Sequence, residues 1–240
     1  KSEGDYSIST AKWINRNPYD VLAGLELQKG GSYKTNVDWN AILDEHGKLR
    51  LSLGLYAPDT ITGLGKTGEG YHTHEDLFWT GFQGDPTKGK PADQSWYGMS
   101  NLVVDKTPIT SEDFNTSFNT GHGKHWFVDG KISKEGEWNY RSVSGYLPTW
   151  RWWVEHSEDS APLKGRYDFD QAYNGGNSLT FEGDLKANSS QNVMLYSTKI
   201  PVTETTKLSV SHKGGVGATA WVAVATKEDY SEYEWKELTP

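Results

Sequence analysis

Apolar positions in the first third of the chain form two kinds of run, one typical of short helices and one typical of buried strands. Residues 9–16 predict a helix that ends before Asn17-Pro18, because a residue that precedes proline disfavours helical backbone. Residues 21–27 are almost continuously apolar, as expected of a parallel strand covered on both faces. Residues 36–43 indicate a second helix and residues 49–56 a second strand, so the order is that of an α/β protein.

The pattern changes along the rest of the chain. A glycine-rich stretch over residues 60–74 predicts a long loop before an aromatic segment at residues 75–79, and such loops are usually functional. Beyond about residue 120, short alternating runs predict an all-β half with strands at 178–182, 193–197, 207–211 and 220–225. We therefore expect an α/β domain over residues 1–125 and a β-sandwich over residues 126–240, incomplete at its C-terminal end.

Composition excludes several classes of function. No apolar run approaches the roughly 18 to 20 residues of a membrane span. The net charge of −8 is spread without a basic stripe, which argues against a nucleic-acid partner. Without cysteine there are no disulfides or thiolate metal sites. The histidines at 72, 74, 122 and 125 lack the spacing of a zinc site, so we expect no metal and no cofactor.

The unusual feature of the composition is its content of large aromatic residues, 11 Trp and 13 Tyr. Large flat rings offer apolar faces to the C–H faces of sugars while their polar edges hydrogen-bond. The same rings also fill sandwich cores and barrel rims. Composition therefore favours sugar handling without excluding a structural role for the aromatic residues.

Several motifs follow one another in a fixed order along the chain. They are Arg16-Asn17-Pro18-Tyr19-Asp20 with Ala23-Gly24-Leu25-Glu26, Ser52-Leu53-Gly54-Leu55-Tyr56, Gly84-Asp85-Pro86, Phe118-Asn119-Thr120-Gly121-His122-Gly123 and Leu147-Pro148-Thr149-Trp150-Arg151-Trp152-Trp153. In this order they resemble glycoside hydrolase family 85, and among its members the endo-D-like ones. Each motif is weak by itself, and it is their order over about 150 residues that is specific. The resemblance implies the C-terminal part of a (β/α)8 TIM barrel followed by a carbohydrate-binding-like β-sandwich.

The resemblance also implies a reaction, the hydrolysis of the β-1,4 bond in the GlcNAc-GlcNAc core of N-linked glycans. In the family the substrate's own 2-acetamido group is the nucleophile, an Asn of an Asn-x-Glu pair orients it, and the Glu protonates the leaving oxygen. This chain contains no Asn-x-Glu; the most similar triplet is Asn36-Val37-Asp38. We therefore expect no catalytic residue in this chain, and a partner in the missing N-terminal half of the same barrel. The family further implies an extracellular or cell-surface bacterial protein.

Barrel enzymes bind substrate at the C-terminal ends of their strands, and this rule selects the candidate substrate-binding residues. They are Glu26 after the first strand, Tyr56 and Asp59 after the second, Tyr33, Trp79 and Trp96 in or beside the following loops, and Asn119 before the Gly121-His122-Gly123 turn. Each has a structural alternative: a salt bridge or cap for Glu26, a core or barrel-plugging position for the rings, and a turn for Asn119.

Two other functions stay open. A non-catalytic glycan-binding module would satisfy the sandwich and the Trp content, and an exposed Trp strip or a calcium site in that half would favour it. A structural or adhesive surface piece is the third possibility. In the tryptophan-rich run at 147–153, alternation would put Trp150 and Trp152 on one face of a strand, and we expect an interdomain seam there.

Overall fold

The computed structural model describes residues 2–65, 68–81, 96–103, 107–148, 152–214 and 217–239. The chain divides into two compact units, residues 1–105 with 149–153, and residues 106–148 with 154–240. This division precedes the domain boundary expected after residue 125, which falls inside strand β3 (His122–Val128). Because β3 pairs with the next strand along the chain, the second unit has to begin before it.

The first unit starts with helix α1 (Glu3–Trp13), which begins earlier than the expected 9–16. A capping box sets this start, with Asp5 N–H donating to Ser2 Oγ at 3.2 Å and Ser2 N–H donating to Asp5 Oδ2 at 2.9 Å. Beyond it, η1 (Pro18–Asp20) is a single 3-10 turn capped by Asn17. The helix was expected too late because its N-terminal cap was not recognised in the sequence.

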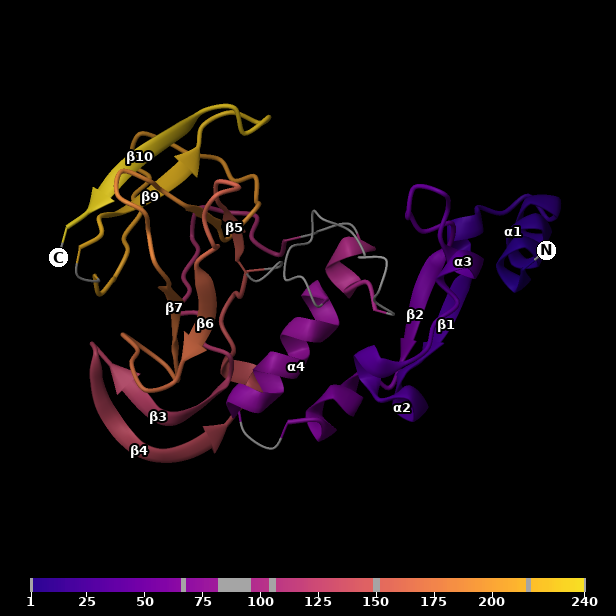
Figure 1. Cartoon of the computed structure of the whole chain (residues 1–240), viewed down its shortest axis with the longest axis horizontal. Helices are drawn as coiled ribbons and strands as arrows, with labels where there is room; N and C mark the ends of the chain where they lie inside the picture. The colour runs from indigo at the N-terminus through magenta and orange to yellow at the C-terminus, as the bar shows by residue number, and fades with distance from the viewer. Residues whose placement is uncertain are drawn as a thin grey trace. The chain divides into compact units, whose positions relative to one another are not determined.

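Strands β1 (Leu22–Glu26) and β2 (Ser52–Tyr56) are parallel, as expected, and lie side by side in Figure 1. Between them the chain forms α2 (Leu27–Gly30), η2 (Ser32–Lys34) and α3 (Trp39–Ile42). The strand–helix–strand order read from the sequence is thus confirmed. The second helix is shorter than the expected 36–43.

The expected loop over residues 60–74 is wrong. The chain forms η3 (Pro58–Gly63) and then helix α4 (Gly68–Thr80), and η4 (Met99–Asn101) follows further along. Within α4 the apolar residues Tyr71, Leu77 and Phe78 pack on the hydrophobic core, at spacings that bring them to one side of a helix. The glycines near the start of this segment hid that pattern.

One hydrophobic core holds the first unit together. Its buried members come from α1, β1, α2, η2, α3, η3, α4 and η4 and from residues beside these elements: Ile8, Leu25, Leu27, Tyr33, Trp39, Ile42, Leu43, Leu51, Ile61, Phe78, Trp96 and Met99. The indole rings of Trp39 and Trp96 meet edge to face with centroids 5.8 Å apart. The core lies on one side of β1, since Leu25 is buried while Leu22 is 67% exposed.

The described elements of the second unit are strands and one 3-10 turn, η5 (Arg141–Val143). Three strand pairs are antiparallel: β3 with β4 (Lys131–Asn139), β6 (Lys164–Asp168) with β7 (Ser178–Glu182), and β9 (Ala220–Ala225) with β10 (Tyr233–Leu238). β5 (Trp153–Glu155), whose last two residues belong to this unit, pairs with β8 (Asn192–Met194). The all-β expectation for this half is confirmed.

The structure confirms some of the expected strands and contradicts others. Those at 178–182 and 220–225 have the expected bounds, and the one at 193–197 is shorter. Residues 207–211 form no strand, because Leu208 and Val210 are both exposed and no buried face fixes a register there. Trp152 has φ 76°, which is not strand backbone, while residues 84–86 and 149–151 lie outside the described residues.

Among the described helices, none is long and apolar enough to cross a membrane.

Candidate functional site

The C-terminal ends of β1 and β2 bring two of the expected binding residues together. In the parallel register Glu26 pairs with Tyr56, Gly24 with Gly54, and Leu22 with Ser52. Neighbouring strands lie about 4.7–4.9 Å apart, and residues in register point to the same face of a sheet. The carboxylate and the phenol are therefore neighbours on the face that points away from the hydrophobic core.

Glu26 is held in place through one of its two carboxylate oxygens. Oε1 accepts the backbone N–H of Gln28 at 2.8 Å and that of Lys29 at 3.4 Å, so Glu26 is the N-cap of α2. The carbonyl oxygen of Glu26 also accepts from Thr35 Oγ1 at 3.2 Å. Among the described residues no group bonds to Oε2, which leaves an oriented carboxylate oxygen open to a ligand.

Tyr56, the last residue of β2, and Asp59, which follows the strand, are both exposed. Tyr56 is 61% exposed, and its hydroxyl makes no hydrogen bond to any described residue. Ala57, with φ 53°, turns the chain into η3, where Asp59 occupies the first turn. Both side chains are therefore accessible to solvent.

A hollow of about 500 Å³ lies along the backbone of β1. Its walls are residues 23–26 of the strand, Lys29, Gly30, residues 35–38 and Ile42. Lys29, Asn36 and Asp38 contribute polar residues that were not nominated from the sequence. Lys29 follows the end of β1 closely, which is the signal that would have found it, whereas Asn36 and Asp38 come only after α2 and η2. Asn36 and Asp38 are also the ends of the triplet most similar to Asn-x-Glu.

The ring candidates near the first strand ends are mostly part of the core. Tyr33 is buried, its hydroxyl lies 2.7 Å from His74 Nδ1, and burial raises the pKa of its phenol. Trp96 is 0% exposed and donates its indole N–H to the Phe78 carbonyl at 2.9 Å. Neither ring offers a face to a sugar, which corrects the expectation for both. Trp79 is 36% exposed and keeps part of its ring accessible.

Asn119 lies in the second unit and is buried by contacts with its own chain. Its Oδ1 accepts the N–H groups of Gly121 at 3.2 Å and Gly176 at 3.4 Å, and its Nδ2 donates to the Val143 carbonyl at 3.0 Å. The side chain thus joins three segments of the unit. These contacts favour the structural alternative over the binding role that we expected.

The histidines of α4 are bound by neighbouring side chains. His72 Nδ1 lies 3.1 Å from Glu75 Oε2, and the ring of His74 stacks on Tyr33 with centroids 5.9 Å apart. Across the part of the chain that the structure describes, no group of three or more His, Cys, Asp or Glu side chains could hold a metal ion.

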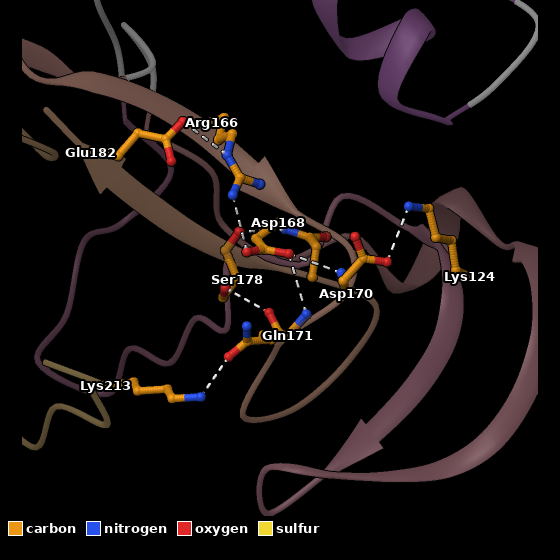
Figure 2. Close-up of polar contacts among 9 residues, drawn as sticks. Lys124, Arg166, Asp168, Asp170, Gln171, Ser178, Glu182 and Lys213 are labelled. Carbon is orange, nitrogen blue, oxygen red and sulfur yellow. Dashed lines mark hydrogen bonds and ion pairs between the residues drawn. The ribbon is translucent and has the colours of Figure 1, made fainter. Parts of the chain in front are cut away.

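A second polar cluster lies at the turn between β6 and β7 (Figure 2). The buried Asp168 accepts the N–H of Asp170 at 2.9 Å and that of Gln171 at 3.2 Å through Oδ1, and its Oδ2 lies 3.4 Å from Arg166 Nη2. Ser178 Oγ donates to the Gln171 carbonyl at 2.7 Å. Both carboxylate oxygens of Asp168 thus contact the protein and fix the turn, whereas Glu26 uses only one of its two oxygens.

Comparison with known proteins decides the family. Residues 1–126 match the profile of Glycosyl hydrolase family 85, which is more than half of the chain. The chain belongs to this family. The resemblance read from the motif order is thereby confirmed.

Proteins that resemble the chain come from bacteria and eukaryotes. One is the crystal structure of the Spr0440 glycoside hydrolase domain, Endo-D from Streptococcus pneumoniae R6, with 64% identity and a TM-score of 0.92. The cytosolic endo-beta-N-acetylglucosaminidase 1 of Arabidopsis thaliana is 24% identical over 189 residues, and the cytosolic endo-beta-N-acetylglucosaminidase of Danio rerio is 25% identical over 204 residues.

The chain is shorter than each of these proteins. The alignment with the Endo-D structure covers 99% of this chain and 38% of that one. The matches cover 77% of the chain for the Arabidopsis protein and 82% for the Danio protein, and 25% of each relative. The chain thus spans about a quarter of the length of these curated relatives.

Proposed function

We propose that this chain is part of an endo-β-N-acetylglucosaminidase that hydrolyses the β-1,4 bond of the GlcNAc-GlcNAc core of N-linked glycans. The observation that carries this proposal is the 64% identity to the Endo-D glycoside hydrolase domain over almost the whole chain. The two cytosolic relatives, both called endo-beta-N-acetylglucosaminidases, support the same reaction.

The reaction we propose is substrate-assisted. The carbonyl oxygen of the 2-acetamido group attacks C1 of its own sugar, the C1–O bond breaks, and the leaving oxygen takes a proton from a Glu. Water then adds to C1 of the oxazolinium and gives a proton to that carboxylate, while the bond between C1 and the acetamido oxygen breaks and the 2-acetamido group is regenerated. The chain contains no Asn-x-Glu, so the catalytic pair lies outside its sequence and this chain alone is inactive.

The first unit forms the later part of a (β/α)8 barrel and the second unit a carbohydrate-binding-like sandwich. Support for the barrel comes from the parallel pair β1–β2 with helices between its strands, and support for the sandwich from the strands of the second unit. Among the described strands β1 pairs only with β2, and its other edge would receive the preceding strand from the rest of the barrel. Because Endo-D comes from a bacterium, we propose that this protein is bacterial as well, and that it acts outside the cell or at its surface.

Within that barrel, Glu26 and Tyr56 would bind hydroxyl groups of the glycan at the strand ends. Oε2 of Glu26 is oriented by the cap on Oε1, and an ionised acceptor forms the stronger kind of hydrogen bond. Asp59 and Trp79 would contact parts of the glycan further out. This assignment agrees with the rule that barrel enzymes bind substrate at the C-terminal ends of their strands.

The test is to incubate a glycoprotein carrying trimmed N-glycans with the chain alone and with the full-length protein that contains it. Mass spectrometry would detect the single GlcNAc left on the glycoprotein. We expect this product from the full-length protein and not from the chain alone. Activity of the chain alone would contradict our placement of the catalytic pair, and an inactive but folded full-length protein would contradict the function.

A non-catalytic glycan-binding module is the second candidate, and one observation favours it. On the ribbon β9–β10 the register pairs Trp235 with Ala223 and Trp221 with Glu237, so both indoles lie on one face together with Tyr233. Trp235 is 50% exposed, and its ring centroid is 6.0 Å from that of Tyr233. Exposed rings beside small alanines form the flat apolar surface on which a sugar ring can stack.

This second function is testable in the same full-length protein. Trp235→Ala should weaken binding of an N-glycan on an array while leaving hydrolysis of a short glycopeptide unchanged. Val224→Ala, on the other face of the ribbon, is the matched control. Unaltered glycan binding by the folded Trp235→Ala variant would contradict the binding-module function.

A further inference from the structure

Two glycines face each other on the open face of the parallel pair. Gly24 of β1 and Gly54 of β2 are in register, one layer below Glu26 and Tyr56 and one layer above Leu22 and Ser52. From the lower to the upper layer is four residues, about 13 Å at the rise of a strand. Side chains of large branched residues usually fill the interior layers of barrels, and this layer has none from either strand.

Backbone geometry does not require these glycines. Neither Gly24 nor Gly54 has a positive φ. A Cβ at Gly24 would have no atom within 4 Å beyond its chain neighbours, and one at Gly54 would make only ordinary contacts, 3.7 Å to Leu22 Cβ and 3.9 Å to the Ala23 carbonyl oxygen. Gly4 is different, because its Cβ would lie 1.8 Å from the Ala41 carbonyl oxygen.

Glycine inside a strand weakens it, and often marks a place where a ligand or another backbone approaches closely. Above Gly24 and Gly54, the free Oε2 of Glu26 and the exposed hydroxyl of Tyr56 supply an acceptor and a donor. Below them, Leu22 offers an exposed apolar side chain. A bare backbone floor with polar groups along its upper rim suits a pyranose ring, whose faces are apolar and whose edge carries hydroxyls.

We infer that Gly24 and Gly54 are specificity determinants, because their missing side chains form the recess in which one sugar ring of the glycan core lies under Glu26 and Tyr56. This inference rests on the proposed function. It adds that the recess is a steric requirement: any side chain at either glycine would occupy the volume of the sugar. The alternative is that a side chain from the rest of the protein fills the recess. In that case a larger residue at either glycine would destabilise the folded protein.

The experiment compares Gly24→Ala, Gly24→Val, Gly54→Ala and Gly54→Val in the full-length protein, with a glycopeptide carrying a GlcNAc-GlcNAc core as substrate. The matched control is Gly63→Val, because a Cβ at Gly63 also meets nothing within 4 Å and its φ is not positive. The readouts are kcat and KM by mass spectrometry of the product, and the thermal unfolding midpoint of each variant.

We expect kcat/KM to fall about tenfold or more for each Val variant and less for each Ala variant, with the unfolding midpoint within a few degrees of wild type and Gly63→Val unchanged. Folded Val variants with wild-type kcat/KM would overturn the inference. Ala variants that unfold would overturn it as well, since the recess would then be filled by the protein's own side chains. An inactive wild-type protein would contradict the proposed function instead, so the two failures are distinguishable.

Discussion

The strand ends of the first unit and the β6–β7 turn of the second unit each carry a carboxylate, and the two carboxylates are used in opposite ways. Asp168 is buried, and both of its oxygens bond to the protein. Glu26 is exposed. One of its carboxylate oxygens caps α2, while the other has no hydrogen bond to any described residue. A fully bonded carboxylate holds a loop, whereas an oriented but partly free one has binding capacity left for a ligand.

The largest effect that separates the two regions is expected at Glu26. Glu26→Gln keeps an oxygen that can cap α2 and removes the charge, so a charge-assisted bond of about 1.5–3 kcal/mol to the glycan is weakened. We expect kcat/KM of the full-length protein to fall by about 10- to 150-fold. The control is Glu45→Gln, at a carboxylate with 87% side-chain exposure. Equal activity of both variants would contradict a binding role for Glu26.

At Asp168 the expected change is in stability. Asp168→Ala leaves the N–H groups of Asp170 and Gln171 without their acceptor, which costs about 1–3 kcal/mol in the free energy of unfolding. Urea unfolding measures it, with the exposed Asp184→Ala as control. The kcat/KM of the folded variant should match wild type. A loss of activity without a loss of stability would contradict the structural role that we assign to Asp168.

A smaller effect is expected at Tyr56. Tyr56→Phe removes one hydroxyl and keeps the ring, so a neutral hydrogen bond of about 0.5–1.5 kcal/mol is lost. The expected drop in kcat/KM is about 2- to 12-fold, with no change in the unfolding midpoint because no described residue bonds to that hydroxyl. Tyr6→Phe, at another exposed tyrosine of the first unit, should have no effect on kcat/KM.

The smallest effect is a dependence on pH far from either site. A hydrogen bond from Arg50 at 2.6 Å and the capping box with Ser2 lower the pKa of Asp5 from 3.8 to about 2. A lowered carboxyl pKa adds stability above the unfolded value, and that stability disappears as the pH falls toward 2. Urea midpoints of wild type and Asp5→Asn should therefore differ at pH 6, approach each other as the pH falls below 4, and converge only below about pH 2. A constant difference would exclude this titration.

The sequence predicted the strands that have strong periodicity and missed features that depend on tertiary partners. The apolar run at 21–27 and the short run at 220–225 located β1 and β9. Helix α4 was missed because glycines early in the segment suggested a loop. A strand at 207–211 was wrong because alternation alone does not supply a pairing partner.

For the site, the sequence found the residues at strand ends but not their environment. Glu26 and Tyr56 follow from the rule about strand ends, and the register places them next to each other. Tyr33 and Trp96 were expected as exposed rings and are buried, because contacts such as Tyr33 with His74 join residues far apart in the chain. The hollow lined by Lys29 and Asp38 could not be seen before β1 and the following loop were placed together.

The most direct test of where the glycan binds is amide hydrogen exchange of the full-length protein, with and without a thio-linked GlcNAc-GlcNAc core glycopeptide that resists hydrolysis. We expect slower exchange in peptides that span residues 22–30 and 52–59, around Glu26 and Tyr56. Protection confined to residues 220–238, on the ribbon β9–β10, would contradict the strand-end site and favour the glycan-binding module.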